Sequence, residues 1–193
     1  MKVPETTSST QGTRRPGLIR VTMVGAITTV MTAVLTLTVS QPARADYFSG
    51  GMPSRSFNVR MVGINPTWVA CFDHGAGWWN GEAGARIWST STAASTFTAG
   101  RYSQSWLGHY QGHGIRHINR TFTIQVNART LQEQSGAHMT QWMRSTCAHE
   151  LGHSLSLADN PNTSQSSLMK HNRNRTTLQG PTAYDIREVE RIY

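Results

Sequence analysis

Segment 149–153, with the sequence His-Glu-Leu-Gly-His, carries the residue types best suited to chemistry in this chain. Two histidines four residues apart lie one turn apart on the same face of a helix, where both imidazoles can bind one tetrahedral zinc ion. Glu150 follows the first histidine directly, so it can reach a zinc-bound water without binding the metal. It can take the proton of that water and pass it to a leaving amine. The spacing therefore indicates metal-assisted hydrolysis.

A helix must position this segment, and the surrounding pattern predicts one from about residue 140 to residue 157. Its apolar positions on or near one face are Trp142, Met143, Cys147, Leu151 and Leu155. Asn160-Pro161-Asn162 has strong turn chemistry and should end the helix. Asp159 lies just before this turn, at a defined distance from His153, and is a candidate third ligand.

The rest of residues 46–193 reads as one α+β domain without internal repeats. Alternating apolar and polar residues predict strands, and proline positions predict helix starts. Strands are expected at 57–62, 85–90 and 121–127, helices are expected to open at Pro66 and at Pro181-Thr182, and 106–110 is a candidate edge strand. Residues 46–55 read as a loose start, 91–103 are ambiguous, and 111–117 are expected to form a glycine-bearing loop.

Residues 149–159, HELGHSLSLAD, resemble the metzincin consensus H-E-x-x-H-x-x-G-x-x-H/D. The aspartate ending is similar to that of snapalysin-type secreted proteases, and the surrounding chain resembles bacterial matrixin-like domains. Ser167-Leu168-Met169 resembles the Met-turn of metzincins, which places Met169 beneath the metal. The resemblance implies a mixed twisted sheet, two large helices, and a small C-terminal subdomain with the Met-turn and a final helix.

The resemblance also implies a function. His149, His153 and Asp159 would bind one catalytic Zn²⁺, Glu150 would be the general base, and the substrate would be a protein or peptide cut at internal bonds. Two alternatives stay open. One is a metalloprotease outside the metzincins, with Asp185 or Glu188 on another helix as third ligand. The other is an inactive zinc-binding extracellular module, which the intact Glu150 argues against.

Two positions depart from the family pattern. Ser156 stands where the consensus has glycine, and serine makes the sharp turn at some backbone cost if its φ is positive. Whether this alters the site is left open. His171 follows Met169 by two residues, where some metzincins carry a tyrosine that contacts the transition state. His171 is therefore a candidate oxyanion contact, and a surface histidine is the alternative.

Residues 1–45 have the layout of a secretory signal peptide. Basic residues precede an apolar, threonine-rich run at 21–39, and Ala43-Arg44-Ala45 fits a small-x-small cleavage rule. The alternative is a membrane anchor, because the run is about long enough to span a bilayer. Cleavage predicts a secreted, extracellular catalytic domain at 46–193 without a membrane association, by the general or the twin-arginine route.

The cysteines and the charge distribution bear on the disulfide and on the partners that we expect for this protein. Cys71 and Cys147 most simply form one disulfide in an exported chain, with buried free thiols as the alternative. The chain carries a formal net charge of +8, but its arginines are scattered after residue 45. A nucleic-acid partner needs a clustered basic face, so none is expected, and we expect a monomer.

Three further histidines, His109, His113 and His117, recur every four residues in glycine-bearing sequence. A second zinc or a structural Ca²⁺ is conceivable there, since matrixins carry additional metal ions. The spacing matches no family pattern, so exposed loop histidines are the simpler interpretation.

Overall fold

The computed structural model describes residues 47–193, which fall within one compact unit. The predicted signal peptide, 1–45, lies outside the described residues and stays a prediction. Among the helices of residues 47–193, none is long and apolar enough to cross a membrane.

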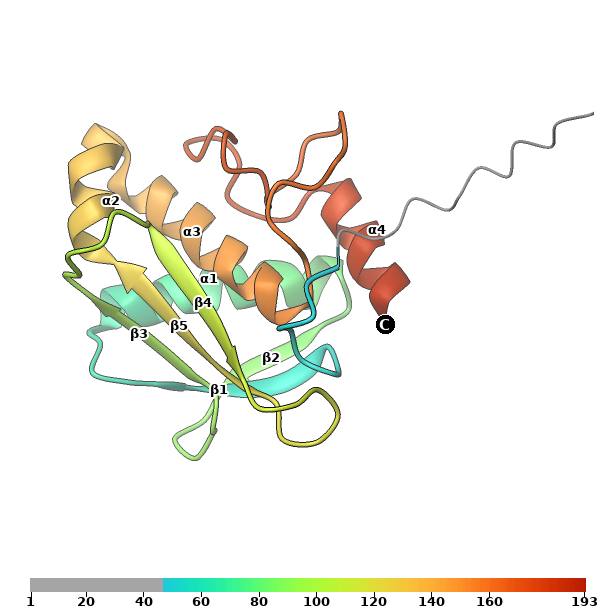
Figure 1. The fold of residues 1–193 in the computed structure, drawn as a ribbon. Coiled ribbons are helices and arrows are strands. Elements are labelled where there is room, and N and C mark those ends of the chain that lie inside the picture. The colour runs from blue at the N-terminus through green and yellow to red at the C-terminus, as the bar shows by residue number, and fades with distance from the viewer. Residues whose placement is uncertain (1–46) are drawn as a thin grey trace, which may run out of the picture. The chain divides into compact units, whose positions relative to one another are not determined.

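Five strands form one mixed sheet in the order β2-β1-β3-β5-β4 (Figure 1). Neighbours from β2 to β5 run parallel, and β4 alone pairs antiparallel, with β5. The strands are β1 (Ser56–Met61), β2 (Arg86–Ser89), β3 (Thr96–Gly100), β4 (Gly108–His113) and β5 (Thr121–Asn127). The antiparallel strand β4 thus lies at one end of the sheet.

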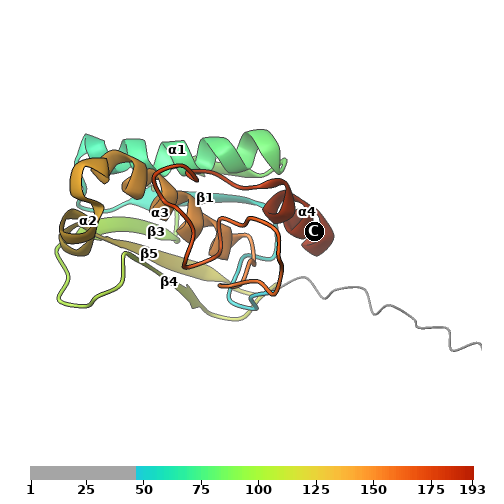
Figure 2. The ribbon, with the colours of Figure 1, turned by 90° about the horizontal axis from the view of Figure 1, so that it is seen from above.

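Two large helices, α1 (Pro66–Glu82) and α3 (Met139–Ser154), cover one face of this sheet (Figure 2). A short α2 (Ala128–Ser135) precedes α3, and α4 (Ala183–Ile192) closes the chain. Asn65 starts α1 by accepting hydrogen bonds from the backbone of Thr67 and Trp68, and Pro66 takes the first helical position. The helix start predicted at Pro66 is confirmed.

α1 and α3 approach each other closely. A Cβ on Gly75 would lie 3.0 Å from backbone atoms of Ala148, so a side chain there would push the helices apart. The Trp79 indole donates to the Ala148 carbonyl at 2.8 Å. The disulfide Cys71–Cys147 joins the same two helices, which confirms the predicted pairing.

The core lies between these helices and the inner face of the sheet. Side chains from both layers are buried there and include aromatic residues of four strands, Phe57, Phe97, Tyr110 and Phe122. The largest are Trp79, Phe72, Phe97, Phe122, Ile124, Leu131, Leu151 and Leu155.

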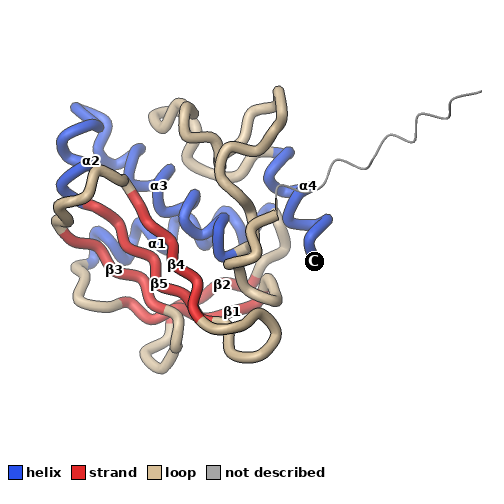
Figure 3. Tube along the Cα trace, viewed as in Figure 1, coloured by secondary structure: helices blue, strands red, loops and turns tan. Residues whose placement is uncertain are grey.

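After α3 the chain runs through a long stretch of loops and turns before α4 (Figure 3). Thr182 and Asp185 form a capping box that starts α4. This C-terminal part carries Met169 and the final helix, so the predicted fold class is confirmed: α+β, with a mixed sheet, two large helices and a small C-terminal part.

Several boundaries differ from the predicted ones. The loop expected at 111–117 is wrong for its first three residues, because β4 stays paired with β5 up to His113. The ambiguous stretch 91–103 contains β3, and α2 was not predicted. The predicted helix 140–157 ends at Ser154, since the backbone turns at Ser156.

Candidate metal centre

The last two turns of α3 present His149 and His153 to the same space. Their Nδ1 atoms lie 3.0 Å from the Leu168 carbonyl oxygen and 2.9 Å from the Leu157 carbonyl oxygen. Because a carbonyl can only accept, each Nδ1 carries the proton and donates it. Each Nε2 therefore keeps its lone pair for a metal, and each ring is fixed in orientation.

A left-handed turn at Ser156 brings the chain back toward these histidines. The φ of Ser156 is 64°, in the region that glycine adopts without cost and serine does not. Arg116 Nη1 donates to the Ser156 hydroxyl at 2.6 Å, and the Tyr193 hydroxyl lies 3.2 Å from it. Serine thus makes the turn expected of the consensus glycine, held by two side chains from distant segments.

The first described residues also pack against this turn. The amides of Phe48 and Met52 donate to the carbonyls of Ser156 and Ser154, each at 2.8 Å. A Cβ on Gly51 would lie 2.3 Å from the Ser156 hydroxyl oxygen. The interpretation of this segment as a loose start is therefore wrong from Phe48 onward.

The turn places Asp159 beside both histidines. Its Oδ1 lies 3.1 Å from His149 Nε2 and 3.5 Å from His153 Nε2. One ligand atom from each of the three residues lies within 4.8 Å of the others. A tetrahedral zinc with bonds of about 2.0–2.1 Å holds its ligand atoms about 3.3 Å apart. The two distances to Asp159 match that spacing, so this cluster could hold a zinc ion.

The protonation states suit metal binding. Burial lowers the pKa of His149 to about 3, and burial also lowers the pKa of His153, so both rings are neutral at pH 7. Burial alone would raise the pKa of Asp159. The contacts of its carboxylate with His149, His153 and His171 outweigh burial and hold that pKa well below its usual range. Two neutral imidazoles and one carboxylate thus face one point.

Glu150 lies beside the cluster, on the side facing β4. Its side chain is buried, and burial together with the charge of Asp159 raises its pKa to about 8. Gly108, the first residue of β4, makes room for it, since a Cβ there would lie 2.3 Å from Glu150 Oε1. A carboxylate of raised proton affinity therefore stands next to the candidate ligands without belonging to the cluster.

Met169 packs beneath the helix that carries the histidines. Both Met169 and Leu168 are buried, and a Cβ on Gly152 would lie 2.6 Å from the Met169 sulfur. The glycine inside the histidine motif therefore permits the close contact with the turn at 167–169. The same turn supplies the carbonyl that orients His149.

Asp185 fixes this turn instead of binding metal. Its carboxylate accepts from the Ser167 hydroxyl at 2.5 Å and from the Leu168 amide at 2.8 Å. Glu188 forms an ion pair with Arg191 at 3.2 Å. Neither residue joins the ligand cluster found among residues 47–193, so the geometry does not support the alternative with a third ligand on the last helix.

His171 lies against the third ligand candidate. Its Nε2 is 2.9 Å from Asp159 Oδ1, and its Nδ1 is 3.0 Å from Asn160 Nδ2. Because the Asn160 amide can only donate, Nδ1 accepts and Nε2–H donates to Asp159. The ring is largely exposed toward the site, with a side chain 60% exposed.

Two cavities open on either side of Glu150. Both are lined by Gly108, His149, Glu150 and His171. The aromatic pocket, about 470 Å³, adds Phe48, His109, Tyr110, His153, Ala158 and Asp159. The arginine pocket, about 300 Å³, adds Ser105, Trp106, Leu107, Gln134, Thr146, Arg173 and Arg175. Together they form a depression along the start of β4.

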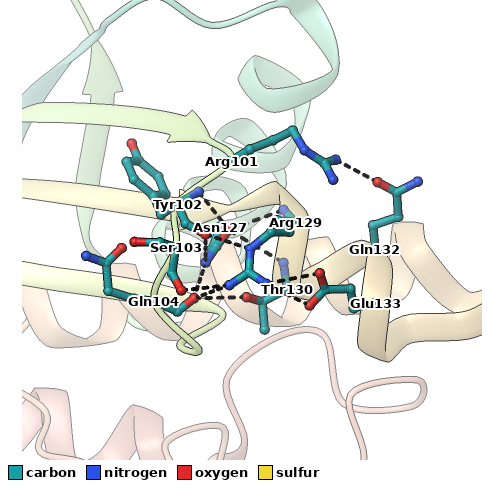
Figure 4. Close-up of polar contacts among 9 residues, drawn as sticks. All are labelled: Arg101, Tyr102, Ser103, Gln104, Asn127, Arg129, Thr130, Gln132 and Glu133. Carbon is teal, nitrogen blue, oxygen red and sulfur yellow. Dashed lines mark hydrogen bonds and ion pairs between the residues drawn. The ribbon is translucent and has the colours of Figure 1, made fainter.

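The loop that walls the arginine pocket is fixed from α2. Arg129 donates to the carbonyls of Tyr102, Ser103 and Gln104 at 2.8–2.9 Å (Figure 4). Asn127 adds a bond to the Gln104 carbonyl at 2.8 Å. These contacts hold the backbone just ahead of Ser105 and Trp106, so this wall is built before any substrate binds.

The other predicted histidines do not gather. His109 stacks on Trp106, with ring centroids 5.6 Å apart, and His113 Nε2 lies 3.1 Å from the Thr123 hydroxyl. His117 follows in the next turn with a φ of 68°. Within residues 47–193, the His149, His153 and Asp159 group is the one set of three that could hold a metal.

Sequence reasoning missed the residues that shape the surroundings of the site. Arg116, Arg173 and Arg175 come from loops whose sequence shows no period. The one usable signal was Gly108, a glycine inside a candidate edge strand, which often marks a close approach to another group.

No protein-family model and no curated protein matches the sequence. The fold is similar to a chain in the GM1-bound form of the ECX AB5 holotoxin, at 13% identity and a TM-score of 0.54, over 76% of this chain and 83% of that one. A weaker overlap is with myroilysin, at 13% identity and a TM-score of 0.48, over 75% of this chain and 96% of that one. Another is with archaemetzincin from Methanopyrus kandleri, at 10% identity and a TM-score of 0.48, over 72% of this chain and 96% of that one. The first likeness shows a shared fold and nothing about activity, and we draw nothing from the weaker two.

Proposed function

We propose that this chain is a zinc-dependent metalloendopeptidase of metzincin type. The observation that carries the proposal is the convergence of His149 Nε2, His153 Nε2 and Asp159 Oδ1 beside the buried Glu150. His149, His153 and Asp159 would hold the ion, and Met169 would lie beneath it. A bound zinc would polarise the scissile carbonyl and lower the pKa of a coordinated water.

Glu150 is the general base of the proposed reaction. It lies beside the candidate ligands and lines both pockets, so its carboxylate could take a proton from the attacking water and pass it to the leaving amine nitrogen. The carbonyls of Leu168 and Leu157 keep both histidines oriented during turnover. His171 donates its Nε2–H to Asp159 and so orients this candidate ligand. To contact the developing oxyanion, the exposed ring would have to turn this donor from Asp159 toward the substrate.

The substrate is proposed to bind as an extended peptide along β4. This strand lies at the end of the sheet. Its first residue, Gly108, lines both pockets, and His109 and Tyr110 line the aromatic pocket. An extended chain can add to a sheet edge through backbone hydrogen bonds, with alternate side chains entering pockets. A protein or peptide therefore suits the site better than a small compact molecule.

Secretion is part of the proposal. The signal-like segment 1–45 and the Cys71–Cys147 disulfide both fit an oxidising, extracellular setting. After cleavage we propose a monomer of residues 46–193, active without a membrane or a nucleic-acid partner.

Casein hydrolysis with and without a chelator tests the proposal. We expect the purified protein to release peptides from casein, to stop when the metal is removed, and to recover on addition of zinc. Release that continues at an undiminished rate in the metal-depleted protein would show that the cluster does not support the reaction.

A further inference from the structure

The arginine pocket has more positive charge than it can neutralise. Arg173 and Arg175 both line it, and Glu150, the proposed base, is the one carboxylate that does. Within residues 47–193, neither arginine forms an ion pair. The pocket thus offers two cations without a dedicated counter-ion.

The two arginines differ in how they are held. Arg173 Nε donates to the Ser145 hydroxyl and Arg173 Nη1 to the Lys170 carbonyl, each at 3.0 Å. Arg175 makes no hydrogen bond to the described residues, and its buried Nε has no partner. Its guanidinium lies over the Trp142 ring, 5.2 Å from the centroid. Arg173 is fixed by structure, whereas the donors of Arg175 are available.

Other groups in the pocket are also short of partners. The hydroxyl of Thr146 is buried there without a hydrogen bond in the described part of the chain. Burial, followed by the charge of Arg175, lowers the pKa of Arg173 to about 9, so both the environment and its neighbour disfavour this cation. A negative ligand would relieve both effects, since unpaired buried charge is costly and a planar guanidinium binds a carboxylate through two parallel bonds.

We propose that the arginine pocket is a specificity subsite that accepts an acidic side chain of the substrate, Glu or Asp, next to the scissile bond. This rests on the proposed peptidase function. We place the subsite next to the scissile bond because His149, Glu150 and Gly108 border the arginine pocket as well as the metal centre. Trp106 and Leu107 supply apolar walls for the methylene groups, and Arg175 supplies the ion pair.

Cleavage specificity tests the subsite. Sites cut in casein and in a mixed peptide library, read by mass spectrometry, should show Glu and Asp enriched at one position flanking the cut. For a matched peptide pair with Glu or Gln at that position, kcat/KM should favour Glu about tenfold or more, the size expected of a charge-assisted hydrogen bond.

Variants assign the preference to Arg175. Arg175→Gln should bring the Glu-to-Gln ratio close to one, and Arg175→Glu should shift the preference to Lys. Arg187→Gln is the matched control, because Arg187 is exposed on α4 and bonds Gln165. It removes the same charge and should leave the ratio as it is. A wild-type ratio near one, or a ratio unchanged by Arg175→Gln, overturns the proposal.

A peptide-binding measurement tests the acidic subsite independently of the proposed peptidase function. Fluorescein-labelled hexapeptides with a central Glu or Gln are titrated against Glu150→Gln protein, with and without Arg175→Gln, by anisotropy. Tighter binding of the Glu peptide that depends on Arg175 supports the subsite even if the wild type cuts nothing, in which case the peptidase proposal fails alone. Cleavage without any Arg175-dependent preference overturns the subsite alone.

Discussion

At the scale of single residues, the turn at Ser156 decides whether Asp159 reaches the two histidines. The consensus glycine would adopt a φ of 64° freely, and serine adopts it against the steric preference of its Cβ. Hydrogen bonds with Arg116 and Tyr193 compensate through the hydroxyl. Ser156 departs from the motif, but its hydroxyl connects the candidate site to the β4–β5 loop and to the C-terminus.

This reading predicts an order of stability among variants of Ser156. Ser156→Ala keeps the Cβ and loses both hydrogen bonds, whereas Ser156→Gly loses the bonds but removes the strain. We expect Ser156→Ala to lower the free energy of unfolding by about 1 kcal/mol more than Ser156→Gly. Urea denaturation of both variants measures this. Equal values, or a more stable alanine variant, would mean that the left-handed turn carries no strain.

Glu150 makes the stability of the metal-depleted protein depend on pH. Its pKa is about 8 in the folded protein and 4.5 in an unfolded chain, so its contribution is complete below pH 4.5 and is lost as pH rises through 8. In chelator, the stability of wild type relative to Glu150→Gln should fall by about 1 kcal/mol or more from pH 5 to pH 8. Urea unfolding of the pair at both pH values checks this, and parallel pH profiles would contradict it. The histidines are common to both proteins, so their opposite effect cancels.

At the scale of elements, the sequence predicted what local patterns encode. The α1 start follows from Asn65-Pro66, β5 from its alternation, and the ligand pair from two histidines on one helix. β3 and α2 were missed, because each has only one large apolar residue, Phe97 in Thr96–Gly100 and Leu131 in Ala128–Ser135. Their positions are set by packing against β5 and Tyr102 to Gln104, which no local pattern records.

The arginine pocket was beyond prediction for the same reason. Its walls come from a loop before β4, from α3 and from the loop at 171–175. These segments are far apart in the sequence and meet only when the fold forms. The candidate ligands could be predicted because they lie within eleven residues of the sequence, whereas the residues that line the proposed subsite are spread over the domain.

The contact between α1 and α3 yields a prediction at this scale. The Cys71–Cys147 bridge closes a long loop, because the two cysteines are 76 residues apart in the sequence. Strands β2 to β5 all lie within this loop. Replacing both cysteines by alanine should lower the free energy of unfolding by about 3–5 kcal/mol. Denaturant unfolding measures the loss. A change below about 1 kcal/mol would show that helix packing around Gly75 and Trp79 suffices without the bridge.

At the scale of the whole molecule, three segments converge on one depression. The edge strand β4 supplies its rim, α3 supplies its floor with His149 and Glu150, and the loops after Ser156 supply Asp159 and His171. The N-terminal segment from Phe48 to Met52 and the C-terminal Tyr193 lock the turn between floor and loops. The candidate metal centre and the proposed substrate depression therefore both depend on segments near the two ends of residues 47–193.

The central claim is that Asp159 helps to hold a zinc ion while Glu150 acts only on the reaction. Zinc per chain and casein hydrolysis, measured together on Glu150→Gln and Asp159→Ala, test it most directly. We predict that Glu150→Gln keeps one zinc and loses hydrolysis by about a hundredfold or more, and that Asp159→Ala loses zinc. A Glu150→Gln protein that cleaves casein as fast as the wild type, or an Asp159→Ala protein with unchanged zinc content, would contradict the account.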